Sequence, residues 1–315
     1  MKVLRIGTRG SPLALWQAEA VAKEIIKING PPCKSVIIKT TGDRVKNLSL
    51  SEIGGKNLFV KEIEEALLNK TIDLAVHSAK DLPTELPSGL IISSSLRRGD
   101  PTDALVMAKG KSMPSADSVS EKIFKLGPKI RVGTDSVRRI AQLKPVWPNA
   151  TFLSIRGNID TRIQKLDRGE YDILVLASAG LIRLGLADRI SSVLPIELCV
   201  PAPCQGIVAI ETRGDDSETN SVVKKICDYD SMASLRAERA TLKTLGGDCR
   251  VPIGALSLRS KKNLRLAAIV ASLDGSRILR QELCGSIEKA EELGLSLASA
   301  LLRNGASEIL TQNLS

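Results

Sequence analysis

The sequence predicts an α/β protein with two parallel-sheet lobes, followed by a smaller α+β domain. Over about the first two-thirds of the chain, short β-branched runs alternate with segments of helical periodicity, which is typical of parallel α/β sheets. Beyond residue 218, two helical segments precede three consecutive strand-like runs joined by short turns, the pattern of an antiparallel sheet. The expected domains are residues 1–98 with 200–218, residues 99–199, and residues 219–315.

The first lobe is expected to begin with a strand at residues 3–8 and a helix after Ser11. Ser11 suits a helix N-cap, and Pro12 suits the first helical position. The apolar face of this helix is predicted to contain Leu15, Ala18, Ala22, Ile25 and Ile26. The other expected elements are strands at 36–40, 72–77, 90–94 and 207–210, and a helix at 61–69.

The second lobe is expected after a turn-rich hinge at residues 98–101. Its predicted strands are 103–107, 130–133, 151–155 and 173–177, with helices from about Ser118, Ser136, Asn158 and Ser178. The last domain is expected to contain helices ending at 226 and spanning 231–245, strands at 253–258, 264–272 and 277–284, and a helix at 286–304. No internal repeat is evident.

Composition narrows the class of protein. The formal net charge is +10, which favours anionic partners, but aromatic residues make up only 2% of the chain, too few for base-stacking platforms. No apolar run has the length of a membrane span, and Arg5 and Arg9 interrupt the place of a signal peptide, so a cytoplasmic protein without a membrane or nucleic-acid partner is expected. Six scattered cysteines without a CxxC motif and a single histidine predict reduced thiols and no metal site.

Arginines and helix-capping residues gather where the predicted strands end. In open α/β sheets, ligands bind beyond the carboxyl ends of the strands, so two lobes facing each other would form a cleft for a ligand with several carboxylates or phosphates. A single arginine is more often a surface side chain, and the prediction depends on the coincidence of many at one edge. They are Arg9 with Ser11, residues 41–43, 78–81, 134–139 and 156–158, Arg162 and Arg183.

Two segments carry chemistry of their own. Residues 72–83 end a buried-type strand with Lys80 and Asp81, and an aspartate there can move a proton or stabilise a cation; a simple loop ion pair is equally consistent with the spacing. His77 lies within that strand and is interpreted as a core residue. Cys249 stands on a glycine-rich turn at 246–252, where Arg250 would lower and Asp248 would raise the pKa of the thiol.

Together, these motifs resemble the porphobilinogen deaminase (hydroxymethylbilane synthase) family, in family order across nearly the whole chain. The matching segments are RIGTRGSPLALWQA at 5–18, GGKNLFVKEIEEALL at 54–68, DLAVHSAKDLP at 73–83, VGTDSVRR at 132–139, IRGNIDTRIQKLDRGEYD at 155–172, AGLIRLGL at 179–186, PAPCQG at 201–206 and GGDCRVPIG at 246–254.

The resemblance implies a monomeric, cytoplasmic transferase of tetrapyrrole and haem biosynthesis. Such an enzyme joins four porphobilinogen molecules head to tail, with release of ammonia, and hydrolyses off the linear tetrapyrrole hydroxymethylbilane. It also implies that the first two domains are similar to the lobes of periplasmic-type binding proteins. Cys249 would hold a dipyrromethane cofactor, built from two substrate units, through a thioether.

The resemblance assigns roles to residues at the family's motif positions. Asp81 would be catalytic, and Phe59 would pack near the reacting ring, with residues 44–57 as a mobile lid. The implied cofactor contacts are Lys80, Asp81, Ser136, Arg138, Arg139, Arg162 and Arg183, and the implied substrate contacts are Arg9, Ser11, Phe59, Arg156 and Arg162. Two residues depart from the family pattern: Asp135 stands where a small hydroxyl residue is usual, and Asp248 where a glycine is common.

Two other classes of function are weighed against this transferase. A two-lobed receptor for an anionic metabolite would explain the α/β pattern and the arginines, but it does not explain the GGDCRVP segment at 246–252. A nucleic-acid-binding protein is suggested only by the basic charge and would show a steep dependence of affinity on salt.

Overall fold

The structure is a computed structural model that describes residues 3–44, 59–247 and 251–314. Contacts within the chain group it into two compact units. Unit 1 contains residues 1–99 and 206–236, and unit 2 contains residues 100–205 and 237–315. The division into three domains made from the sequence stays a prediction. No helix within the described ranges is both long enough and apolar enough to cross a bilayer.

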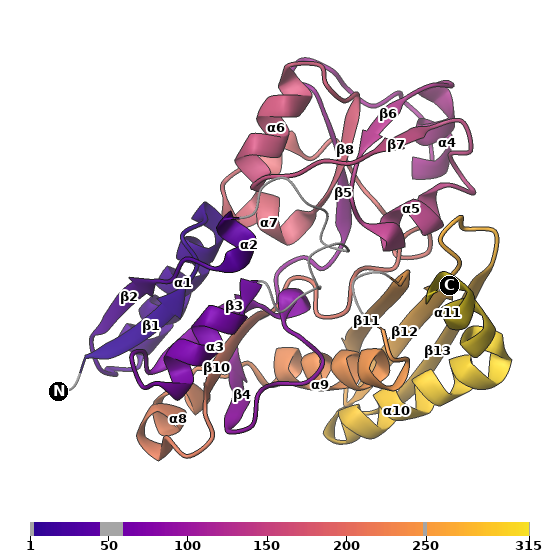
Figure 1. Cartoon of the computed structure of the whole chain (residues 1–315). Helices are drawn as coiled ribbons and strands as arrows, with labels where there is room; N and C mark the ends of the chain where they lie inside the picture. Colours follow the sequence, from indigo (N-terminus) through magenta and orange to yellow (C-terminus); the bar gives the residue numbers. More distant parts are fainter. Residues whose placement is uncertain (1–2, 45–58, 248–250, 315) are drawn as a thin grey trace. The chain divides into compact units, whose positions relative to one another are not determined.

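Unit 1 is built on a five-stranded mixed sheet with the strand order β2-β1-β3-β10-β4. The three strands β1, β2 and β3 are parallel, and β10 runs antiparallel to both β3 and β4. The core on one face contains residues of α1 and α8, whereas α3 packs on the other face (Figure 1). The elements are β1 (Leu4–Thr8), α1 (Pro12–Lys27), β2 (Cys33–Ile37), α2 (Thr41–Arg44), α3 (Lys61–Leu68), β3 (Leu74–Ser78), β4 (Leu90–Ser95), β10 (Val208–Arg213), α8 (Ser217–Lys224) and the start of α9 (Tyr229–Thr244).

The first helix begins as the sequence predicts. The Ser11 hydroxyl accepts a hydrogen bond from the Ala14 N–H at 3.3 Å, and Pro12 occupies the first turn, where its missing N–H costs nothing. The predicted apolar face is wrong in two places, because Leu15 and Ile26 are exposed. The helical period turns them away from the sheet, and the buried positions are Ala14, Gln17, Ala18, Val21 and Ile25.

Unit 2 contains a second five-stranded mixed sheet with the order β7-β6-β8-β5-β9. Here β6, β7 and β8 are parallel, and β5 runs antiparallel to both β8 and β9. Its elements are β5 (Asp103–Met107), α4 (Val119–Lys125), β6 (Arg131–Gly133), α5 (Val137–Leu143), β7 (Thr151–Leu153), α6 (Ile159–Asp167), β8 (Ile173–Ala177), α7 (Ser178–Arg183) and β9 (Ser192–Val193).

The C-terminal part of unit 2 is a three-stranded antiparallel sheet, as predicted, with α10 packed against β12 and β13 (Figure 1). The helix expected at 286–304 is found over Ala290–Leu301, but a second helix beyond it was not predicted. Gly305 has a φ of +96°, a left-handed conformation that interrupts the helix, and a second helix follows. The elements are β11 (Ile253–Ser260), β12 (Asn263–Ala271), β13 (Ile278–Ser286), α10 (Ala290–Leu301) and α11 (Ser307–Leu314).

The parallel pairing that the alternating strands and helices predict holds for β1–β3 and β6–β8, and the remaining strands make each sheet a mixed one. Both β10 and β5 are antiparallel to their neighbours, since the chain crosses between the units before each of them. The strand expected at 36–40 lies earlier, at Cys33–Ile37, and the two-residue strand β9 was not predicted.

The two mixed sheets share one structural device, which shows that they are repeats of each other. In unit 1, Arg5 of β1 donates through its backbone N–H and its guanidinium to Asp73, which precedes β3. In unit 2, Arg131 of β6 makes the same set of bonds to Asp172, which precedes β8. The strand orders also correspond, so the two sheets repeat one topology, although no internal repeat was found in the sequence.

Candidate active site

The carboxyl edge of the first sheet collects the residues predicted at the strand exits of unit 1. Because β1, β2 and β3 are parallel neighbours, their carboxyl ends meet at one edge. Arg9 and Ser11 follow β1, Thr41 begins the helix after β2, and Lys80 and Asp81 follow β3. This edge therefore brings cationic, hydroxyl and carboxylate groups together.

Arg9 is held at this edge by Asp43 and Phe59. Its Nη2 lies 2.5 Å from Asp43 Oδ1, and its guanidinium carbon lies 4.3 Å from the centre of the Phe59 ring. Burial opposes ionisation of Asp43, but the Arg9 guanidinium and the Thr40 hydroxyl hold the pKa of that carboxyl below its usual value. A Cβ at Gly42 would overlap the Phe59 ring, so a glycine is needed there. Arg9 and Phe59 thus lie side by side.

Asp81 stands on a short 3-10 turn, Ala79–Asp81, that continues directly from β3. The Ala79 N–H donates to the Ile207 carbonyl at 3.0 Å, and the Gln17 side chain of α1 donates to the Ser78 hydroxyl at 2.8 Å. Asp81 and its neighbour Lys80 are half-buried. The turn is therefore anchored on a strand and a helix, while its acid and base remain accessible.

The carboxyl edge of the second sheet carries the remaining predicted arginines. Ser136 caps α5 by accepting from the Arg139 N–H at 3.4 Å, and its neighbour Asp135 is exposed. Arg162 Nε donates to the Gly157 carbonyl at 2.8 Å, which holds the side chain beside the turn after β7. Burial lowers the pKa of Arg183 on α7 to about 10. A carboxylate bound there would offset this desolvation.

Arg138 and Arg139 are buried and share one carboxylate. Arg138 Nη1 lies 2.8 Å from Asp103 Oδ2, and Arg139 Nη2 lies 2.7 Å from Asp103 Oδ1. Burial alone would raise the pKa of Asp103, but the two guanidiniums hold it far below its usual value. Gln205 also donates to Asp103, at 2.9 Å. In this structure, both predicted cofactor clamps are engaged by an internal acid.

Sequence reasoning assigned Asp103 only to the start of a strand. The sequence signal for its role is an acid as the first residue of an otherwise apolar strand. In the structure, Asp103 pairs with Ala177, the last residue of β8, and therefore lies at the carboxyl edge of the parallel strands. Removing this carboxylate would leave two buried cations without their partner, a situation that is costly in any fold.

Two sequence-based expectations fall outside the described residues. They are the attachment of a cofactor to Cys249, with its neighbour Asp248, and residues 45–57 of the expected lid. Of the described cysteines, Cys199 is fully buried, and burial together with the nearby Asp103 raises the pKa of its thiol to about 12. Cys199 is thus a poor nucleophile.

His77 is buried, in agreement with its interpretation as part of the core. Its Nε2 lies 3.0 Å from Oε2 of the fully buried Glu211 on β10. Glu64 of α3 lies on the same face of the sheet, and burial together with the charge of Glu211 raises the pKa of Glu64 to about 7, against a smaller lowering effect of His77. The nearest cation along β10, Arg213, donates instead to the carbonyls of Leu67 and Ile72.

The raised pKa of Glu64 predicts that stability falls as the pH rises from about 4.5 to about 7. In that window the unfolded chain has released the proton that the folded chain still holds, and above it the penalty is constant. Glu64→Gln removes the penalty and is expected to stabilise the fold at pH 8 by about 1–3 kcal/mol relative to the parent, with little effect at pH 4.5. Urea unfolding at both pH values measures this. Glu65→Gln, at an exposed position of the same helix, is the control, and an equal effect of both substitutions would contradict the prediction.

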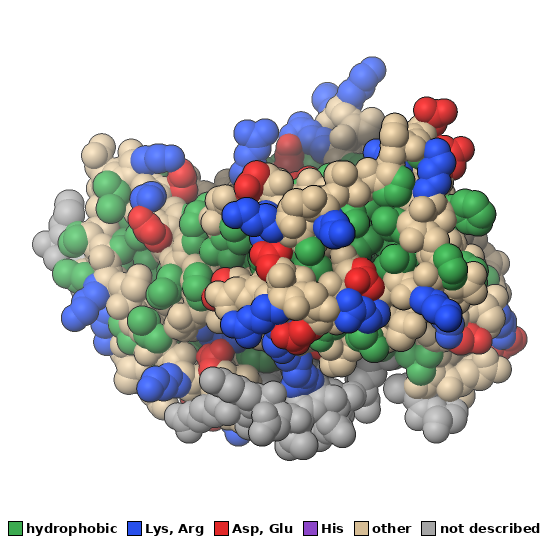
Figure 2. Space-filling view, turned by 90° about the horizontal axis from the view of Figure 1, so that it is seen from above, with side chains coloured by type: hydrophobic (Ala, Val, Ile, Leu, Met, Phe, Trp, Pro, Cys, Tyr) green, Lys and Arg blue, Asp and Glu red, His purple; other side chains and the backbone are tan. Residues whose placement is uncertain are grey.

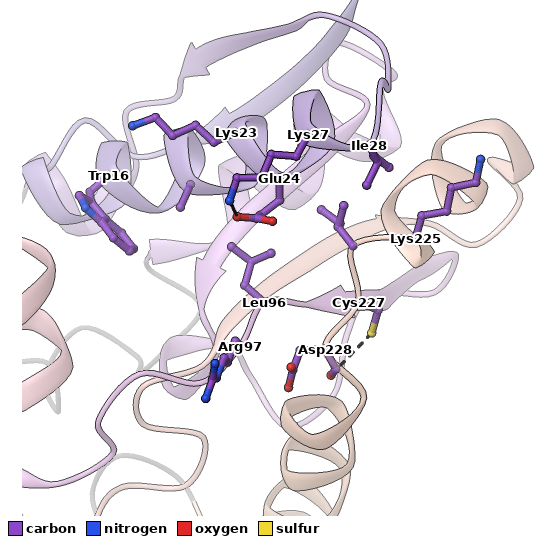
Figure 3. Close-up of a pocket in the computed structure, with 12 residues that line it drawn as sticks. Trp16, Lys23, Glu24, Lys27, Ile28, Leu96, Arg97, Lys225, Cys227 and Asp228 are labelled. Atoms are coloured by element: carbon purple, nitrogen blue, oxygen red, sulfur yellow. Dashed lines mark hydrogen bonds and ion pairs between the residues drawn. The ribbon is translucent and has the colours of Figure 1, made fainter.

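A pocket of about 620 Å³ lies along α1 in unit 1, on the flank of the sheet (Figure 3). Trp16, Lys23 and Lys27 line it from α1, and Leu96 and Lys225 line it from other segments. Glu24 pairs with Lys27 at 2.6 Å within the pocket. None of the predicted site residues lines it, so it does not belong to the candidate active site.

Surface charge argues against a nucleic-acid footprint on the face seen in Figure 2. Lys and Arg side chains are scattered over that face, with acidic and apolar side chains among them. A binder of the phosphate backbone would instead present a basic stripe. The arginines at the two carboxyl edges define a different class: an α/β protein that binds a small molecule with several acidic groups.

Comparisons with known proteins identify the family within this class. Residues 4–221 match the family model "Porphobilinogen deaminase, dipyromethane cofactor binding domain", and residues 232–303 match "Porphobilinogen deaminase, C-terminal domain". The chain belongs to the porphobilinogen deaminase family.

Curated relatives match the chain over its whole length. The porphobilinogen deaminase of Carboxydothermus hydrogenoformans is 43% identical over 312 residues, which cover 99% of this chain and 97% of the relative. That of Chlorobium chlorochromatii is 45% identical over 317 residues, covering 99% and 98%. Among solved structures, the immunogenic lipoprotein A of Vibrio vulnificus is 13% identical, covers 75% of this chain and 99% of its own, and has a TM-score of 0.44. That last similarity is too low to bear on function.

Proposed function

We propose that Asp81 is the catalytic residue of this porphobilinogen deaminase activity, and that Cys249 and the arginines of the two carboxyl edges hold the cofactor and the growing chain. As a member of its family, the chain joins four porphobilinogen molecules, with release of ammonia, into hydroxymethylbilane in tetrapyrrole biosynthesis. The observation that supports the assignment of Asp81 is its position on an anchored, accessible turn at the edge where Arg9 and Phe59 also lie.

Loss of ammonia from porphobilinogen leaves a positively charged pyrrole, and the chemistry of Asp81 suits this step. A carboxyl group can deliver a proton to the departing amine, and the resulting carboxylate stabilises the cation. The Gln17–Ser78 and Ala79–Ile207 hydrogen bonds hold the turn on its strand, so the carboxyl group needs little reorganisation.

The residues at the second carboxyl edge fit a dipyrromethane cofactor. Each pyrrole carries an acetate and a propionate, and the desolvated guanidinium of Arg183 and the positioned side chain of Arg162 are suited to such groups. Further hydrogen-bond donors would come from Lys80 and Ser136, and a carboxylate from Asp81. Arg138 and Arg139 would bind both Asp103 and the ligand through different N–H groups. When bound through Cys249, the dipyrromethane supplies the pyrrole carbon to which the first porphobilinogen is joined.

Substrate binding is assigned to Arg9, Ser11, Phe59, Arg156 and Arg162. Arg9 and Phe59 form a cation–ring pair that would present a guanidinium to a carboxylate and an apolar face to a pyrrole ring. Arg156 follows β7 and is half-buried. From the resemblance to the family, we also propose that the enzyme works as a cytoplasmic monomer.

Arg156 offers a test of this assignment. Arg156→Gln is expected to raise KM for porphobilinogen about 10-fold or more, since a charge-assisted hydrogen bond to a carboxylate contributes about 1.5–3 kcal/mol. Steady-state assays of ammonia release measure the change. The control is Arg168→Gln, an exposed arginine that ends α6 outside the predicted site, and it should leave KM unchanged. If Arg156→Gln also leaves KM unchanged, Arg156 does not bind substrate.

A further inference from the structure

Glu64 of α3, His77 of β3 and Glu211 of β10 form a buried polar cluster in unit 1, here called the buried triad. Their exposed fractions are 6%, 6% and 0%. Within the described part of the chain, Glu64 Oε1, His77 Nε2 and both carboxylate oxygens of Glu211 are buried without a hydrogen bond, although His77 Nε2 lies 3.0 Å from Glu211 Oε2. A buried polar atom without a partner costs stability, so such a cluster requires an explanation beyond packing.

The repeat of the fold in unit 2 shows what the same positions need for packing alone. The ion-paired acids Asp73 and Asp172 occupy equivalent positions, so residues of this helix and strand in unit 1 correspond to residues about 99 positions later in unit 2. Two further pairs agree: Leu67 and Leu166 are both buried on the preceding helix, and the residues three positions later, Lys70 and Gly169, both have a positive φ. The helix before the strand and the strand itself can therefore be compared residue by residue.

At the positions of the buried triad, unit 2 carries only apolar side chains. Ile163 stands for Glu64 and Leu176 for His77 by the same offset. Val106 stands for Glu211, because Glu211 pairs with Ala75 across the sheet and Val106 pairs with the equivalent Leu174. These three apolar residues lie in one hydrophobic cluster. The architecture itself is thus satisfied without polar groups at these positions.

The buried triad, with polar side chains at these positions, occurs in unit 1, which also carries Lys80 and Asp81. His77 is the fourth residue before Asp81 and contacts Glu211 diagonally across β3 and β10. A register shift between Ile210 and Glu211 interrupts the pairing of β10 with β4, and irregularities of this kind redirect side chains next to functional sites. On the opposite face, the next residue of β3, Ser78, is held by Gln17. Of the last two residues of β3, Ser78 is thus held by a hydrogen bond, and His77 lies close to the carboxylate of Glu211.

We propose that His77 and Glu211, supported by Glu64, are positioning residues that fix the exit of β3 and thereby the turn carrying Lys80 and Asp81. A close contact between two buried polar side chains forms in only one register of the strand, whereas apolar side chains can pack in several. Whether a buried polar group gives such specificity has to be tested for each protein. The proposal rests on the proposed catalytic role of Asp81.

The decisive variant copies unit 2 into unit 1: Glu64→Ile, His77→Leu and Glu211→Val together. Because well-packed apolar residues often replace a buried ion pair without loss of stability, the triple variant is expected to unfold at a temperature close to that of the parent. Its kcat is expected to fall at least 10-fold with KM within 3-fold. Hydrogen exchange of residues 79–82, followed by mass spectrometry, is expected to speed up at least 10-fold relative to β10.

A second, conservative variant keeps the proposal testable if the triple variant does not fold. Glu211→Gln retains the shape and an acceptor and is expected to lower kcat by 3-fold to 10-fold, with faster exchange of the same turn. The control is Val76→Ala, which creates a cavity on the opposite face of β3. It should lower the unfolding temperature without changing the exchange of the turn relative to β10.

The outcomes separate the two proposals. If the triple variant folds with the kcat and turn exchange of the parent, or if Glu211→Gln changes neither quantity, the triad is only structural and the inference is wrong. If Asp81→Asn proves fully active, the proposed role of Asp81 fails, and the exchange of residues 79–82 still decides whether the triad holds the turn.

Discussion

Asp81→Asn is expected to lower kcat by at least about 100-fold while the cofactor stays attached. Asparagine has the size of aspartate but can neither deliver a proton to the departing amine nor carry the negative charge that stabilises the cationic pyrrole. The turn should persist, because its anchoring bonds come from Ser78 and from the Ala79 backbone and not from Asp81. Ammonia release gives kcat, and intact mass reports the attached cofactor.

Asp117→Asn is the matched control, since it makes the same change on an exposed loop residue. A parental rate in Asp81→Asn would remove Asp81 from the mechanism. A variant that lacks the added mass would show instead that Asp81 is required to assemble the cofactor, and the loss of rate would then say nothing about turnover. Porphobilinogen titrations of the variant that carries the cofactor keep these cases apart.

The sequence predicts the regular elements well where local signals and sheet burial agree. The strand Asp103–Met107 has the predicted bounds, and α1 begins at Pro12 because Ser11 and Pro12 are both local start signals. Strand direction depends on long-range pairing, so the antiparallel β10 could not be derived from its own residues. The predicted helix end at 304 agrees with the positive φ of Gly305, but the helix Ser307–Leu314 that follows was not predicted.

The repeat has a sequence signal that is visible only with the structure. RIGT at 5–8 and RVGT at 131–134 place the ion-paired arginines within β1 and at the start of β6. Each glycine allows a close approach, since a Cβ at Gly7 would overlap Ile72 and one at Gly133 would overlap Leu174. Four residues are too few to identify a repeat in a chain of this length, and the matching aspartates lie far along the sequence.

The candidate site was predicted in its parts but not in its pairings. The arginines at the strand exits were recognised because the carboxyl edge of a parallel sheet follows from topology. Arg138 and Arg139 share Asp103, which lies more than thirty residues before them in the sequence. Arg9 and Thr40 share Asp43, and Arg9 is again far from that acid in the sequence. Such long-range pairings cannot be derived from local sequence patterns. The same holds for His77 and Glu211, which are brought together only by the return of β10 to the first sheet.

Cys249→Ala is expected to abolish both the cofactor and the activity. If the dipyrromethane is held by a thioether to this sulfur, the parent should exceed its sequence mass by two linked pyrrole units, and the variant should have its sequence mass. Without the tethered primer there is no retained pyrrole to extend, so the release of hydroxymethylbilane should fall below detection. Intact-mass measurement of both proteins, followed by an assay of product, tests each part separately.

Cys284→Ala is the control, because Cys284 is an exposed thiol on β13 outside the predicted site and should keep both the added mass and the rate. The same measurement tests the receptor interpretation, in which an anionic ligand binds reversibly. Added covalent mass in the parent protein would exclude that interpretation. Added mass that survives in Cys249→Ala would place the attachment at another residue. A parent protein that is fully active at its sequence mass would refute covalent priming altogether, since the acceptor for the first porphobilinogen would then have to be free in solution.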